Sequence, residues 1–154
     1  MSSLIERLAA ENAEIDLSSL SHADAFTIGS DLVREGMAAE SPIAVSIVFG
    51  EQRVFHAALA GSNADNDLWL ERKLRVVARY NEPSHLVGER WRAKGRDIVE
   101  LAAPGSLFLP APGGGFPLRV RGSLVGGIAL SGLTDLEDHD LVVAALRRHL
   151  QLSS

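Results

Sequence analysis

Two polar side chains lie among apolar residues in the segment 65–80, DNDLWLERKLRVVARY. When the segment is wound as a helix at about 100° per residue, Asn66 and Lys73 fall on its apolar side together with Trp69. A lysine in such surroundings must extend its ammonium group to water, pair with a carboxylate or give up its proton more easily. Two interpretations stay open. Either Lys73 pairs with a buried aspartate or with a chain terminus at a subunit interface, or Asn66 and Lys73 face a pocket for an oxygen-rich or anionic ligand.

A second polar group interrupts the apolar stripe of the last predicted helix, residues 134–150. The sequence TDLE at its start is a capping box. His139 lies on the stripe and needs a hydrogen-bond partner, either inside the fold or on a ligand. Asp138 suits the positive end of the helix dipole. Because Ser131 and Gly132 come directly before this helix, we expect all four residues to meet at the rim of a pocket.

Glycines mark the segment between residues 111 and 132. Gly113, Gly114 and Gly115 precede a fixed Phe-Pro pair, and their amides predict either a concave anion-binding nest or a flexible turn. Gly126 and Gly127 lie inside a predicted strand, where a missing side chain indicates close approach of another backbone. The segment matches neither a phosphate-binding Walker loop nor a dinucleotide fingerprint.

The apolar periodicity predicts one α+β domain. Its expected strands are 43–49, 53–60, 106–109, 116–121 and 124–130, and its expected helices after the first are 21–39, 65–80, 84–94 and 134–150. We treat residues 1–20 as an N-terminal helical arm that packs on a neighbour, and residues 21–154 as the domain. Two glycines spaced seven apart in the helix 21–39 predict close packing on the sheet.

Composition excludes several classes of protein. The chain has 154 residues, no cysteine and a net charge of −5. It therefore has no disulfide, no thiolate metal site and no cysteine nucleophile, and its acidity argues against a nucleic-acid partner. The longest apolar runs are too short to span a bilayer, and the first residues lack the features of a secretory signal, so we expect a cytoplasmic protein without a membrane partner. The five histidines show no metal-binding spacing, and we expect no metal site.

Four ordered motifs carry a family resemblance: GSNADNDLWLERK, GGGFPLRV, GSLVGGIALSGL and EDHDLVVAAL. Together they resemble an uncharacterised branch of the GlcG/HbpS family, also called haem-degrading-domain proteins, from about Ala23 to Leu150. The resemblance implies a profilin-like fold, a mainly antiparallel five-stranded sheet flanked by helices, and assembly into homo-oligomers. It also implies binding of haem or another small molecule in some relatives. Pro112 stands where many relatives have a histidine, so no haem-ligand role is carried over there, and His56 is the alternative haem ligand.

The combined prediction is an oligomeric protein that binds a small molecule, haem-like or carboxylate, of unassigned identity. One alternative is an enzyme acting on a small carbonyl or carboxylate compound, with Lys73 as acid, base or electrostatic anchor and His139 as proton carrier. The other is a noncatalytic oligomeric scaffold. The predicted ligand-binding residues are Asn66, Trp69, Lys73, Gly113, Gly114, Gly115, Ser131, Gly132, Asp138 and His139.

Overall fold

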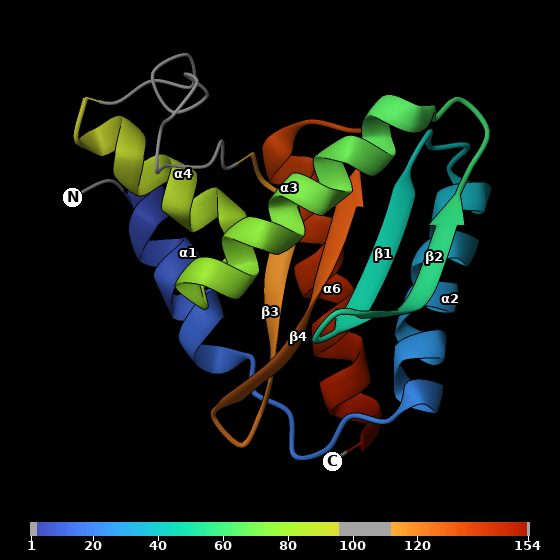
Figure 1. Ribbon diagram of the computed structural model, residues 1–154, viewed down its shortest axis with the longest axis horizontal. Helices are drawn as coiled ribbons and strands as arrows, with labels where there is room; N and C mark the ends of the chain where they lie inside the picture. Colours follow the sequence, from blue (N-terminus) through green and yellow to red (C-terminus); the bar gives the residue numbers. More distant parts are fainter. Residues whose placement is uncertain (1–2, 96–111, 154) are drawn as a thin grey trace.

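The chain folds around an antiparallel sheet. The structure is a computed structural model that describes residues 3–95 and 112–153. Within these residues the sheet has four strands in the order β2-β1-β4-β3 (Figure 1). The strands are β1 (Ala44–Phe49), β2 (Gln52–Ala58), β3 (Gly115–Val120) and β4 (Ser123–Ser131). The expected five-stranded sheet is thus a four-stranded one in this part of the chain, and the strand predicted at 106–109 lies outside the described residues.

Helices cover both faces of the sheet (Figure 1). They are α1 (Ser3–Glu14), α2 (His22–Ala38), α3 (Ala64–Tyr80), α4 (Ser84–Ala93) and α6 (Asp135–Ser153). One face carries α3, which contacts β1, β3 and β4, and the other carries α2 and α6. The pair α1 and α4 packs together, with α4 reaching α3, α6 and β3. The α+β class predicted from the sequence is confirmed. No helix of the described part is long and apolar enough to cross a membrane.

Central strand β1 is buried on both faces, which explains its β-branched sequence. Val45 and Ile47 point to the main core between the sheet and helices α2 and α6. Ala44 belongs instead to a smaller cluster beneath α3, with Leu70 and Leu74. The side chains of the main core come from the sheet and from both helices of that face: Ile28, Leu32, Val45, Ile47, Phe116, Leu118, Ile128, Leu130, Val142, Val143 and Leu146.

Helix ends follow the local sequence signals. Ser21 and Asp24 form a reciprocal capping box at the start of α2. At the start of α6, the Thr134 hydroxyl accepts from the Glu137 amide, and the Glu137 carboxylate accepts from the Thr134 amide, as the TDLE motif predicts. Helix α3 is followed by the C-cap residue Asn81, whose φ of 54° is left-handed.

Glycine spacing in α2 has the predicted function in packing. A Cβ atom on Gly29 would lie 2.4 Å from the ring of Phe55 in β2, and one on Gly36 would lie 2.7 Å from the side chain of Ile43. The absence of both Cβ atoms lets α2 approach the sheet closely. This prediction is therefore confirmed.

The N-terminal helix packs within its own chain. Ile5 and Leu8 of α1 are buried against Leu86 of α4. Residue Leu17, just after α1, joins the β3 edge, where its carbonyl accepts from the amide of Arg121 at 2.8 Å. Apolar contacts between α1 and α4, together with the Leu17 hydrogen bond at the β3 edge, thus hold residues 3–17 against the rest of the chain. The division into an arm, 1–20, and a domain, 21–154, stays a prediction.

The two strand glycines differ in what a side chain would meet, and this difference is testable. A Cβ on Gly126 would lie 1.9 Å from the backbone oxygen of Val48. One on Gly127 would lie 3.1 and 3.2 Å from the side chains of Leu74 and Val77, and its nearest backbone neighbour is 3.7 Å away, at an ordinary contact distance. Because backbone yields less than side-chain ends, Gly126→Ala is expected to lower the free energy of unfolding by about 3 kcal/mol and Gly127→Ala by about 1 kcal/mol. Urea denaturation measures both, and equal losses would contradict the register of β1 and β4.

Candidate functional site

Lys73 is buried and paired with an aspartate. Only 2% of the residue is exposed. Its ammonium group donates to the Leu130 carbonyl at 2.7 Å and to Asp138 Oδ2 at 3.2 Å. Of the two interpretations open at the sequence level, pairing with a buried aspartate is the one observed. The second interpretation concerns a pocket, and a cavity lies directly beside this pair.

Three elements hold the pair. Lys73 comes from the middle of α3, Leu130 from the end of β4 and Asp138 from the first turn of α6. The other carboxylate oxygen of Asp138 accepts from the Leu133 amide at 3.0 Å, which fixes the side chain against the helix start. A Cβ on Gly114 would lie 3.0 Å from the ammonium nitrogen, so a glycine leaves room for the lysine head group.

Asn66 bridges the start of α3 to the end of β4. Its side-chain oxygen accepts from the Asn63 amide at 2.9 Å as part of a capping box. Its amide nitrogen donates to the Ser131 hydroxyl at 3.1 Å. The residue that interrupts the apolar face of α3 is thus used for capping and for a polar contact beside Lys73.

A cavity of about 380 Å³ opens beside these groups, and we call it the α3–α6 cavity. Its walls are Asn66, Trp69, Lys73, Pro112, Ser131, Gly132, Leu133, Asp135 and Asp138. Of the ten predicted ligand-binding residues, the structure brings six to this wall: Asn66, Trp69, Lys73, Ser131, Gly132 and Asp138. Trp69 is 37% exposed, and the guanidinium of Arg72 stacks on its ring at 4.9 Å. A strand end, the middle of a helix and a helix start thus enclose one polar space.

The three consecutive glycines are buried and do not line the cavity. A Cβ on Gly113 would lie 2.2 Å from His85 Nδ1, and the Gly115 amide donates to the Ser84 hydroxyl at 2.9 Å. The Gly114 carbonyl accepts from the Leu130 amide. Of the two interpretations open at the sequence level, an anion-binding nest or a flexible turn, the close neighbours at Gly113 and the Gly115–Ser84 hydrogen bond favour a turn, and a tightly packed one. A direct ligand contact by Gly113, Gly114 or Gly115 stays a prediction.

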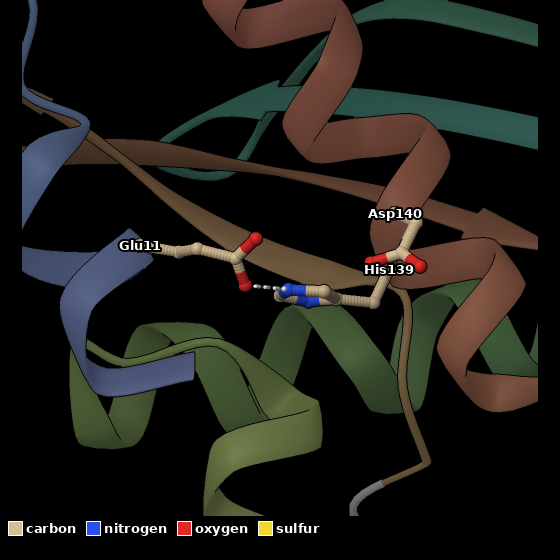
Figure 2. Close-up of side chains that lie close together, drawn as sticks. All are labelled: Glu11, His139 and Asp140. Atoms are coloured by element: carbon tan, nitrogen blue, oxygen red, sulfur yellow. Dashed lines mark hydrogen bonds and ion pairs between the residues drawn. The ribbon is translucent and has the colours of Figure 1, made fainter. Parts of the chain in front are cut away.

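His139 turns away from the cavity toward α1. Its Nε2 lies 2.8 Å from Glu11 Oε1, and the residue is 1% exposed (Figure 2). Burial lowers the pKa of His139, although the Glu11 carboxylate partly opposes the shift. The expectation of a partner inside the fold is confirmed. The wall of that cavity does not include His139, because successive helix residues point about 100° apart and this side chain faces α1 instead. Its roles in ligand binding and as proton carrier stay predictions.

Burial shifts both members of the lysine–aspartate pair toward their neutral forms. It lowers the pKa of Lys73, while the charge of Asp138 acts in the opposite direction. It raises the pKa of Asp138 from 3.8 to about 6, and here Lys73 and the Leu133 amide oppose the shift. The pair therefore responds to proton concentration in the range where an ordinary aspartate is already ionised.

Three cavity residues were not among the predicted site residues. Asp135 lies three positions before Asp138, and this spacing places both on one face of α6. That signal was present in the sequence. Leu133 and Pro112 lie outside the helices and strands, so hydrophobic periodicity gives no signal that they line the cavity. His56, the alternative haem ligand, lies 2.7 Å from the Ser46 hydroxyl and 3.4 Å from Asp67, and it is not part of the cavity wall.

The fold and the site define an α+β domain with a small polar cavity between one covering helix, the end of a central strand and the start of the last helix. Residues 20–147 match the model of the HbpS-like haem-degrading protein family. The chain belongs to this family, as its motifs indicate.

Relatives and solved structures agree with this assignment. A UPF0303 protein of Streptomyces coelicolor is 47% identical over 128 residues, which cover 82% of this chain and 81% of the relative. The crystal structure of the Ybr137w protein is similar with a TM-score of 0.82 and 24% identity, covering 94% of this chain and 87% of that one. A complex of PduOC with haem has a TM-score of 0.67 and 19% identity, and the match covers 84% of this chain and 94% of that one. These two structures show a shared fold.

The raised pKa of Asp138 makes stability depend on pH. A carboxyl group that binds its proton more tightly in the folded state stabilises the fold below its unfolded pKa, and this contribution is lost as the pH rises through the folded pKa. For a rise from 3.8 to about 6 the loss amounts to about 3 kcal/mol at most. Between about pH 4 and pH 7, the free energy of unfolding of the wild type should therefore fall relative to that of Asp138→Asn. Urea denaturation across this range measures it; Glu51→Gln, at an exposed turn, is the control and should follow the wild type.

Removing one partner of the buried pair should cost more than removing both charges. Lys73→Met leaves Asp138 buried without its counter-charge, and we expect a loss of about 3 kcal/mol at neutral pH. In Lys73→Met/Asp138→Asn no charge is left unpaired, so about 2 kcal/mol of this loss should be recovered. Denaturant unfolding of both variants tests this coupling. A double variant less stable than Lys73→Met would contradict the direct pairing.

Proposed function

We propose that this protein binds a small oxygen-rich molecule in the α3–α6 cavity. The observation that carries the proposal is a buried lysine–aspartate pair that forms part of the wall of a cavity of about 380 Å³. Buried ion pairs contribute little net stability compared with apolar residues of similar size. A function at the cavity accounts for the presence of this pair better than stability does.

The polar groups of the wall favour a carboxylate or carbonyl compound that also carries a hydroxyl or amine group. Lys73 has three ammonium hydrogens, and two of them have partners among the described residues. The Ser131 hydroxyl is a further donor, so oxygen atoms of a ligand can be bound. Asp135, in contrast, offers a carboxylate that accepts hydrogen bonds, which suits a ligand hydroxyl or amine.

Haem fits this cavity less well than a small molecule does. One structural neighbour is a complex with haem, and haem iron in proteins takes histidine, cysteine, methionine or tyrosine as ligands. None of these residue types is among the described residues of the wall. Pro112 occupies the place of the histidine that the family resemblance implies, and His56 and His139 are hydrogen-bonded elsewhere. We therefore favour a ligand without iron.

A homo-oligomeric state in the cytoplasm is part of the same proposal. Several large apolar side chains are exposed on the isolated chain, which supports contacts between subunits. They are Phe26, Met37, Leu68, Trp69, Leu124 and Val125. The absence of cysteine and the net charge of −5 support a reducing compartment and a partner other than nucleic acid.

Native mass spectrometry followed by a thermal-shift screen tests the proposal. The first measurement reports the subunit number and any retained ligand. The screen covers small hydroxy acids, keto acids and sugars, with haemin as a separate arm. We expect an oligomer and a rise in Tm with at least one hydroxylated carboxylate, lost in Asn66→Ala and in Trp69→Ala. Arg53→Gln, on the edge strand β2, is the control and should keep the rise.

Two results would contradict the proposal. The first is a saturable Soret shift with haemin that persists in Asn66→Ala and Trp69→Ala, because haem would then bind elsewhere. The second is a ligand-induced rise in Tm that both variants keep unchanged. A monomer in the mass spectrum would remove the oligomer from the proposal and leave the cavity in place.

A further inference from the structure

A second polar cluster lies on the other side of the α6 start, where α1 approaches it (Figure 2). Glu11, His139 and Asp140 each offer one ligand atom, and these atoms lie within 4.8 Å of one another. Glu11 and His139 are buried, with 6% and 1% of the residue exposed, whereas the Asp140 side chain is about half exposed. A buried carboxylate and a buried imidazole thus meet an accessible carboxylate.

The spacing of these atoms is close to that of a metal site. Around a tetrahedral ion with bonds of about 2.1 Å, neighbouring ligand atoms lie about 3.4 Å apart. His139 Nε2 and Glu11 Oε1 are already 2.8 Å apart. The exposed side chain of Asp140 has the freedom to move the remaining ångström or so, since solvent borders it.

The protonation state of His139 also suits a metal ligand. A metal requires neutral imidazole with a free lone pair. His139 Nδ1 has no hydrogen-bond partner among residues 3–95 and 112–153, so Nδ1 is free to carry the ring proton; the only bond given up is the one from Nε2 to Glu11, at the position the ion takes. Nε2 is then free to bind an ion that also contacts Glu11. The ion would replace the present Nε2–Glu11 contact by two bonds to one positive centre.

From this geometry we propose that Glu11, His139 and Asp140 form a binding site for a divalent transition metal ion, with Zn²⁺ as its best fit. One imidazole nitrogen and two carboxylate oxygens match the mixed ligands that zinc accepts, whereas calcium and magnesium prefer oxygen alone. A fourth position opens to a cleft of about 590 Å³ between α1 and α6. Water or a solute group from this cleft completes the coordination.

Arginines at the cleft compete with the ion. The guanidinium of Arg7 donates to Asp140 at 2.9 Å and lies 4.0 Å from Glu11. Arg147 also approaches Glu11, at 4.0 Å, but it binds mainly Glu14 at 2.7 Å. Arg7 therefore supplies positive charge to the cluster when no ion is bound. Binding of Zn²⁺ requires Arg7 to leave Asp140, and its side chain, 45% exposed, can turn into solvent.

The competition gives a test with effects of opposite sign. Isothermal titration of the chelator-treated full chain with ZnCl₂ should show one site per chain. Asp140→Asn should weaken Zn²⁺ binding about tenfold or more, and Arg7→Gln should tighten it several-fold. His56→Gln is the matched control, because His56 also lies beside a carboxylate, at 3.4 Å from Asp67, but outside this cluster. It should leave the affinity unchanged.

Cobalt gives a second readout that stability changes do not imitate. Co²⁺ in a four-coordinate site absorbs strongly in visible light, whereas hydrated Co²⁺ absorbs weakly. We expect this spectrum in the wild type and in Arg7→Gln, and its loss in His139→Gln and in Asp140→Asn. The melting temperature of each variant without metal shows whether it is folded. Equal Zn²⁺ affinity in the wild type and Asp140→Asn, or the absence of any binding to the wild type and Arg7→Gln, would overturn the proposal.

Discussion

The burial of one ammonium group is the constraint on which the arrangement of this protein depends. Lys73 comes from the apolar side of α3, and its Nζ is held by a β4 carbonyl and by a carboxylate from α6. An unpaired charge at this depth would cost several kcal/mol, so the covering helix, the central strand and the last helix must keep one relative position. The Asn66–Ser131 hydrogen bond adds a second link between the same helix and strand. The cavity beside these groups is lined by the polar side chains of this junction together with Trp69, Pro112 and Leu133.

The start of α6 separates two polar regions. Asp138 points to α3 and the cavity, whereas His139 and Asp140 point to α1. Because consecutive residues in a helix project about 100° apart, one short sequence serves both regions. A movement of α6 at its first turn would alter the lysine–aspartate pair and the α1 contact together. This gives the cavity and the cleft at α1 a physical connection through one helix.

Much of the fold follows from local sequence. The β-branched run of β1, the capping box of α6 and the glycine spacing of α2 each predict the element or contact that the structure shows. The anomaly of Lys73 on an apolar face also pointed to the buried pair beside the cavity, because a charge in that position needs a partner. Local sequence could not predict which residue is the partner of Lys73. Asp138 lies 65 residues from Lys73, and only the packing of α3 and α6 over the end of β4 brings the two together.

By itself the sequence determined the helix and strand periods, the helix ends and the residues whose polarity conflicts with their apolar surroundings, since these depend on neighbours within a few positions. The tertiary structure decided which distant groups become the partners of these polar residues. It paired Lys73 with Asp138 at a cavity, turned His139 toward Glu11 on a helix 128 residues away, and packed Gly113–Gly115 into a closed turn. These outcomes depend on the angle at which distant elements meet, and an amino-acid pattern does not contain that angle.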